Sequence, residues 1–241
     1  MNHGRTISPR FDLPVTTAPA TQVLSELGIR LPAVDVLPVL VEPDSYLPVV
    51  KPSAEPLVEV HHRRIRTLSN YWHAGWNCAR PVTLLRSGAF DRLAAVAEAL
   101  PDRFGLAVFD GWRPLDLQAE LFEAAYTDPD LPEGFVSPPN PDPTMPPPHL
   151  TGGTVDLTLT IDGIALAPEG GFDDFTDRAH ADALENASGP GRDIRRMLFW
   201  AMRSQGFVVL QQEWWHFEYG TRRWAAITGT TPFYGPGIPT E

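Results

Sequence analysis

Two short motifs hold the residue types that bind a catalytic metal ion. The first, HLTGGTVD, runs from His149 to Asp156, and two glycines separate the imidazole from the carboxylate. A glycine pair lets the backbone turn sharply, so the two side chains can meet at one point. The second, EWWH, begins 57 residues after Asp156 and places Glu213 three residues before His216. This order and spacing predict one metal centre built from both motifs.

Zinc is the metal that this set of residues suggests. Imidazole nitrogens and carboxylate oxygens bind zinc at about 2.0–2.2 Å, and catalytic sites use three protein ligands with a fourth position open for water. We therefore interpret His149, Asp156 and His216 as ligands of one zinc ion per chain. Glu213 lies close to a ligand without being needed as one, so it can take a proton from the water that zinc activates.

A third motif, DGWRP, places Arg113 three residues after Asp110. An arginine at the end of a buried strand is often the partner in a structural ion pair. Its fixed, forked charge also suits the oxyanion of a tetrahedral intermediate. Because the other two motifs indicate hydrolytic chemistry, we favour the second role for Arg113.

Hydrophobic periodicity predicts the elements that must position these motifs. The expected helices cover residues 87–100, 114–125 and 191–205, and the expected strands cover residues 106–110, 155–161, 207–211 and 215–219. Ser87 suits an N-terminal cap, Gly206 a C-terminal cap, and Asp162-Gly163 a hairpin turn. Helices and strands do not alternate as βαβ units, so the sequence predicts an α+β fold with a mainly antiparallel central sheet flanked by helices.

Prolines mark two further segments. Nine of the 26 prolines fall in the first 60 positions, where they prevent long helices and central strands. We expect residues 1–60 to form an extended, proline-rich N-terminal arm and residues 61–241 to form a single domain. The second cluster, residues 137–148, ends directly before His149. Prolines stiffen a loop, so this cluster is expected to form a rigid wall beside the site.

Composition narrows the class of protein. The formal net charge is −11, from 30 acidic and 19 basic residues, which argues against a nucleic-acid partner. A single cysteine, Cys78, forms no internal disulfide and implies no oxidising compartment. The first 20 residues lack the apolar core of a secretory signal, and no stretch approaches the ~20 apolar residues of a membrane span. We therefore expect a cytoplasmic protein without a membrane partner; its oligomeric state stays open.

Four motifs in order give the chain a resemblance to a known family. They are GLAVFDGWRP at 105–114, PHLTGGTVDLTL at 148–159, GFDDFTDRAH at 171–180 and EWWHFEYG at 213–220. In these motifs the chain resembles the D-alanyl-D-alanine dipeptidases, the VanX-type zinc peptidases. The resemblance runs from about residue 60 to 220 and finds no counterpart for the first 60 residues.

The resemblance implies a role for each matching residue. The three proposed ligands match the zinc ligands of the family, and Glu213 matches its general base and later proton donor. Arg113 matches the arginine that stabilises the transition state. Asp173 matches the carboxylate that reads the free amino group of a small dipeptide substrate, and Tyr71 is expected to supply a further substrate contact.

The chain departs from the family pattern at two positions. The family usually has Ser two residues before its ligand histidine and Ala two residues before its ligand aspartate; here these positions are Pro147 and Thr154. Because Pro147 has no hydroxyl, we expect recognition of the C-terminal half of the dipeptide to differ from that in the family. Neither change touches the expected metal ligands.

Three other functions use similar residues. A D,D-carboxypeptidase or an amidase acting on peptidoglycan peptides would use the same kind of metal site, but it usually needs export. A non-haem iron oxygenase also uses two histidines and one carboxylate, although its carboxylate typically follows the first histidine by two residues rather than seven. A zinc-binding module without catalysis is the third alternative, and the presence of both Glu213 and Arg113 argues against it.

Overall fold

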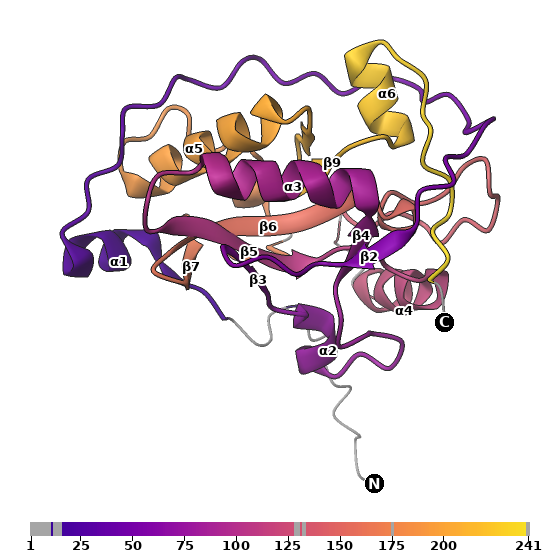
Figure 1. Ribbon diagram of the computed structural model, residues 1–241, viewed down its shortest axis with the longest axis horizontal. Helices are drawn as coiled ribbons and strands as arrows, with labels where there is room; N and C mark the ends of the chain where they lie inside the picture. Colours follow the sequence, from indigo (N-terminus) through magenta and orange to yellow (C-terminus); the bar gives the residue numbers. More distant parts are fainter. Residues whose placement is uncertain (1–10, 12–15, 128–130, 132–133, 175, 240–241) are drawn as a thin grey trace, which may run out of the picture.

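The computed structural model describes residues 11, 16–127, 131, 134–174 and 176–239. It is a mixed α+β structure whose central sheet has seven strands (Figure 1). Parts of two predicted segments lie outside the described residues: positions 1–10 and 12–15 of the expected arm, and Phe175 of the GFDDFTDRAH motif.

The strands of the central sheet are joined mostly by antiparallel pairing. In chain order they are β1 (Ala18–Pro19), β3 (Ile65–Thr67), β5 (Phe104–Asp110), β6 (Thr154–Ile161), β7 (Ile164–Ala167), β8 (Val208–Leu210) and β9 (Glu213–Glu218). One path through the sheet runs β1-β7-β6-β5-β3, and β9 extends it by pairing with β6 and β8. The β1–β7 and β3–β5 pairs are parallel, so the sheet is mixed rather than purely antiparallel. A separate antiparallel pair joins β2 (Leu57–Glu59) to β4 (Leu84–Arg86).

Helices cover both faces of the sheet (Figure 1). They are α1 (Ala20–Leu27), α2 (Asn70–Ala74), α3 (Ser87–Ala99), α4 (Leu115–Ala125), α5 (Pro190–Ser204) and α6 (Arg222–Thr228). α3 and α5 pack on one face, where Leu93 and Leu198 join a core with Leu106 and Leu157 of the strands. α2 and α4 lie on the opposite face and form a smaller apolar cluster.

Most predicted elements have counterparts in the structure, and of the two predicted helix caps one agrees with it and one does not. Gly206 follows the last residues of α5 with φ of 84°, the left-handed conformation expected of a C-terminal cap. Ser87, by contrast, is the first residue of α3, and the capping position belongs to Arg86, whose side chain makes no capping bond. The prediction that Ser87 caps this helix is therefore wrong. A residue distant in the chain accepts a hydrogen bond at this helix start instead: Gly88 N donates to Glu55 Oε2 at 2.9 Å.

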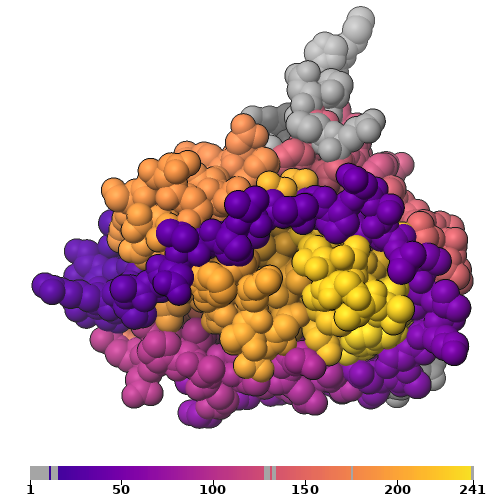
Figure 2. Space-filling model, turned by 90° about the horizontal axis from the view of Figure 1, so that it is seen from above, coloured from indigo at the N-terminus to yellow at the C-terminus, as the bar shows by residue number. Residues whose placement is uncertain are grey.

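The N-terminal segment differs in part from a simple extended arm. It contains α1 and pairs with the sheet through β1, whereas residues 29–56 have neither helix nor strand. Figure 2 shows this segment crossing the surface made by the last third of the chain, coloured orange to yellow. It is held there by hydrogen bonds, among them Arg222 Nε to the Leu47 carbonyl at 3.0 Å. The domain boundary at residue 60 stays a prediction.

Candidate active site

Strand register places three polar residues side by side. Asp110 at the end of β5 faces Asp156 on β6, and Asp156 faces His216 on β9. Directly opposed residues share one face of a sheet with Cβ atoms about 4.5–5.5 Å apart. On β6 the alternation sends Val155 and Leu157 into the core and leaves Asp156 on the other face. Hydrophobic alternation thus builds the centre of the site.

Glu213 reaches the same point through an irregularity in the sheet. In a regular strand, a residue three positions from His216 would point to the opposite face. The β8–β9 pairing shifts register between Val209 and Leu210, which breaks the alternation near Glu213. As a result Glu213 Oε2 lies 3.4 Å from His216 Nδ1.

The loop that carries His149 is a single 3-10 turn, His149–Thr151, followed by the predicted glycine pair. Gly152 adopts a φ of 73°, a conformation that glycine accepts without strain. A Cβ atom on Gly153 would lie 2.3 Å from the Tyr219 carbonyl oxygen, so only glycine fits there. Arg86 fixes the turn, since its Nε donates to the Thr151 carbonyl at 2.8 Å. Both glycines are therefore required by the way this loop packs.

The three predicted ligands converge on a position suited to a metal ion. One donor atom from each of His149, Asp156 and His216 lies within 4.8 Å of the other two, and all three residues are buried. His149 Nε2 lies 3.3 Å from both His216 Nδ1 and Asp156 Oδ2. Within the described chain, Asp156 Oδ1 is among the buried side-chain atoms that lack a hydrogen bond. Electron-pair donors crowded in this way call for a cation, and two imidazoles with one carboxylate fit zinc.

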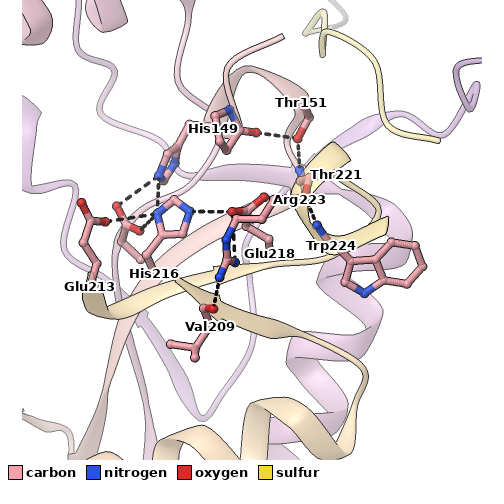
Figure 3. Close-up of polar contacts among 12 residues, drawn as sticks. His149, Thr151, Val209, Glu213, His216, Glu218, Thr221, Arg223 and Trp224 are labelled. Atoms are coloured by element: carbon pink, nitrogen blue, oxygen red, sulfur yellow. Dashed lines mark hydrogen bonds and ion pairs between the residues drawn. The ribbon is translucent and has the colours of Figure 1, made fainter. Parts of the chain in front are cut away.

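Outer contacts orient both imidazole rings, and Figure 3 shows the contact of His216 with Glu218. His149 Nδ1 contacts the Gly111 carbonyl at 2.7 Å, so its Nε2 faces the other ligands. His216 Nε2 lies 3.3 Å from Glu218 Oε1, so its Nδ1 faces them. A metal-binding histidine commonly donates its other N–H to such an acceptor. The sequence prediction gave Glu218 no role, although its position two residues after His216 in a strand was a usable signal.

Burial and charge set the acid strengths around the site. Burial, with help from Asp156, raises the pKa of Glu213 to about 7. Burial alone would also favour the neutral form of Glu218, but its hydrogen bond with His216 and the charge of Arg223 lower its pKa to about 2. Glu213 thus has a pKa suited to a general base at neutral pH, whereas Glu218 stays ionised.

Arg113 lies beside the metal ligands in a buried network. Its Nε donates to Asp110 Oδ2 at 2.8 Å, and its Nη1 donates to Gln118 Oε1 at 3.0 Å. Its Nη2 lies 3.7 Å from Asp156 Oδ2, which places the guanidinium next to the proposed ligand set. Neighbouring acids raise the pKa of Arg113 despite its burial, so the charge is permanent. Gln118 was missed by the sequence reasoning because its helical position looks like an ordinary surface residue.

Tyr71 and Asp173 meet at the same pocket. The Tyr71 hydroxyl lies 3.4 Å from Asp173 Oδ1 and accepts a hydrogen bond from Arg113 Nη2 at 3.3 Å. Burial raises the pKa of Asp173 well above its usual range, and the nearby Asp156 adds to this. Asp173 Oδ2 is buried without a hydrogen bond, which leaves an acceptor for a donor from outside the chain.

The site opens into a pocket of about 400 Å³. The seven predicted site residues line it, together with residues 145–148 of the proline-rich loop, which therefore forms a wall. Pro147 is part of that wall and offers no hydroxyl. Thr154, the second departure, is fully buried in β6. The pocket also receives Glu42 and Tyr46 from the N-terminal segment.

The fold and the site together define a candidate metal-dependent hydrolase. Comparison with known proteins makes this specific. A family profile described as D-ala-D-ala dipeptidase, of the peptidase M15 group, matches residues 82–228. The chain therefore belongs to the D-ala-D-ala dipeptidase family, a family of peptidases, which confirms the resemblance seen in the four motifs.

Two curated relatives carry the same name. A D-alanyl-D-alanine dipeptidase of Synechocystis sp. is 26% identical over 214 residues, which span 73% of this chain and 86% of that protein. A D-alanyl-D-alanine dipeptidase of Escherichia coli is 35% identical over 138 residues, which span 56% of this chain and 66% of that protein. None of the helices among the described residues has the length and apolar character needed to cross a membrane.

Proposed function

We propose that the chain is a zinc-dependent dipeptidase that hydrolyses D-alanyl-D-alanine or a similar short D-amino-acid dipeptide. The proposal depends above all on one observation: His149, Asp156 and His216 converge in a pocket that also holds Glu213 and Arg113. Bound by these three ligands, zinc supplies a Lewis acid that makes water more acidic and polarises the scissile carbonyl.

Glu213 is proposed to move the proton. Its raised pKa, about 7, suits a group that takes a proton from the attacking water and later gives it to the departing amine. Arg113 is held by Asp110 and Gln118, so its charge is already in place when negative charge develops on the carbonyl oxygen. Glu213 thus handles the proton, and Arg113 stabilises the negative charge that develops on the carbonyl oxygen.

Asp173 and Tyr71 are proposed to select the substrate. The unpaired oxygen of Asp173 accepts a hydrogen bond from the free ammonium group of a dipeptide, and Tyr71 holds the other oxygen. The proline-rich wall and the N-terminal segment enclose the pocket and favour short peptides. The net charge of −11 does not repel a dipeptide, because a zwitterion has no net charge. We propose that the activity is cytoplasmic.

Release of D-alanine tests the proposal. Zinc-loaded protein is expected to release D-alanine from D-alanyl-D-alanine, to leave L-alanyl-L-alanine intact, and to lose at least about 100-fold in kcat in the Glu213→Ala variant. The variant should still bind one zinc ion, because Glu213 is outside the ligand set. Cleavage of pentapeptides ending in D-alanyl-D-alanine, but not of the dipeptide, would instead indicate a carboxypeptidase. Iron with oxygenase activity would overturn the proposal.

A further inference from the structure

Glu42 connects the N-terminal segment to the candidate metal centre. It lies 40 positions before the residues matched by the family profile, which begin at 82. Its carboxylate accepts two hydrogen bonds from Arg223, one of them from Nε at 2.7 Å. It also accepts the backbone N–H of Gln211 at 3.0 Å, in the turn that precedes Glu213. Glu42 thus contacts both the turn that precedes β9 and helix α6, which follows it.

A row of alternating charges runs from Glu42 to a proposed zinc ligand. Arg223 Nη1 lies 3.5 Å from Glu218 Oε1, and the same oxygen lies 3.3 Å from His216 Nε2. Figure 3 shows Arg223 and Glu218 side by side next to His216. Arg223 and Glu218 are 5% and 1% exposed, so solvent screens these contacts little.

Geometry decides what each contact can do. A bidentate Arg–carboxylate pair fixes the plane of the guanidinium, which a single contact does not. Glu42 makes such a pair with Arg223, and Arg223 also donates to the Val209 carbonyl. The guanidinium is therefore locked on two sides, and its third edge meets Glu218. The Thr221 hydroxyl donates to Glu218 Oε2, which leaves Glu218 Oε1 to contact His216 Nε2.

We propose that Glu42 is a positioning residue of the metal centre: through Arg223 and Glu218 it fixes the ring of His216, and through Gln211 it fixes the turn before Glu213. The proposal rests on the zinc dipeptidase function proposed above. It gives the N-terminal segment a part in catalysis, although that segment lies outside the matched family region.

The alternative is that Glu42 only anchors the segment to the body. An anchor contributes to the stability of the metal-free protein but does not change zinc affinity. A positioning residue changes zinc affinity and kcat, because outer contacts of metal ligands typically contribute 10- to 100-fold to affinity or activity. Two residues, Arg223 and Glu218, stand between Glu42 and the ligand His216, so we expect about 3- to 10-fold for the loss of Glu42.

The test compares Glu42→Gln with Asp44→Asn in the full chain. Both variants remove one negative charge from the same segment, and Asp44 is exposed. We expect Glu42→Gln to weaken zinc binding and lower kcat by about 3- to 10-fold each, with KM changed less, whereas Asp44→Asn matches the wild type. The absorption bands of the cobalt(II)-substituted protein should shift only in Glu42→Gln. Zinc is titrated against a chromophoric chelator.

Two outcomes overturn the proposal. One is zinc affinity and kcat in Glu42→Gln within twofold of those in Asp44→Asn. The other is a lower unfolding temperature of metal-free Glu42→Gln with an unchanged cobalt spectrum, which indicates an anchor only. Arg223→Lys is the second variant, since it keeps the charge but not the forked geometry, and it should reproduce the Glu42→Gln effect. A wild type that binds zinc without cleaving dipeptides would refute the proposed function alone, because zinc affinity and the cobalt spectrum still test Glu42.

Discussion

Asp173 occupies an unfavourable position in three respects. Its φ of 58° is rare for a residue other than glycine, its Oδ2 is buried without a partner, and burial raises its pKa. Residues held in this way are typical of functional sites, where a ligand supplies what the chain does not. The proposed substrate ammonium fills that role for Asp173.

We predict that Asp173→Asn stabilises the metal-free protein while it impairs activity. In the unfolded chain Asp173 ionises near pH 4, whereas the folded state raises its pKa and so resists ionisation. The folded state therefore loses stability above pH ~4, and asparagine, which tolerates positive φ, avoids this loss. Each kcal/mol gained raises Tm by about 2–4 °C.

Calorimetry at two pH values checks this prediction. The gain in Tm should appear at pH 8 and largely vanish at about pH 3, where the carboxyl is mostly protonated in both states. In the same variant kcat/KM for the dipeptide should fall by about 10- to 100-fold, the contribution of a charged hydrogen bond. Equal Tm values at pH 8 would show that burial of Asp173 costs the fold nothing.

The sequence could identify the residues at the centre better than those around it. His149, Asp156, Glu213 and His216 lie in two short motifs, so their types and spacing were enough to group them. Glu218 lies in the same motif, but its contact with His216 depends on strand alternation. No local pattern relates Glu42 to the site, because its partners are distant in the chain and depend on the complete fold.

At the level of elements, α5 positions the loop that carries Asp173. Arg195 in α5 is 4% exposed and donates its hydrogen bonds to backbone carbonyls of residues 168–180. The acceptors are Pro168, Glu169, Arg178 and His180. Each of these carbonyls accepts a hydrogen bond from the Arg195 guanidinium, so α5 fixes the position of the loop backbone.

We therefore predict that Arg195→Met loosens this loop. Loss of the donors leaves partly buried carbonyls unpaired, which costs on the order of 3 kcal/mol and lowers Tm by about 6–12 °C. Amide hydrogen exchange within residues 168–180 should become faster, and KM should rise because Asp173 loses its fixed place. Arg203→Met on the exposed face of α5 is the control, and it should leave the exchange rate within residues 168–180 and the KM unchanged. An exchange rate equal to that of the control would contradict the prediction.

Element types were predictable where periodicity is local, and pairing was not. α3, α5 and β6 each repeat apolar residues at helical or strand spacing, which needs no partner to be recognised. The parallel β3–β5 pair joins strands separated in the chain by α2, β4 and α3, and β1 has only two residues. Short strands carry too little periodicity to be recognised, and their direction depends on connections that the sequence does not describe.

For the whole molecule, zinc is expected to act as a stabilising ligand. A ligand that binds only the folded state at 100 times its Kd adds about 2.7 kcal/mol, which raises Tm by about 5–10 °C in a chain of this size. Calorimetry of the protein with zinc and with a chelator should show this difference. It should disappear in His149→Ala, which removes one of the three ligands. A zinc-dependent shift of the same size in that variant would place the metal elsewhere.

The contact of Glu42 with Arg223 also has a consequence for synthesis on the ribosome. The two residues are 181 positions apart in the chain. At about 5–20 residues per second, roughly 10–35 s pass between the synthesis of one and the other. All three proposed ligands also lie in the second half of the chain, and His216 comes last. A nascent chain therefore has no complete proposed metal centre until His216 has left the ribosome, so the proposed hydrolysis cannot begin before that point.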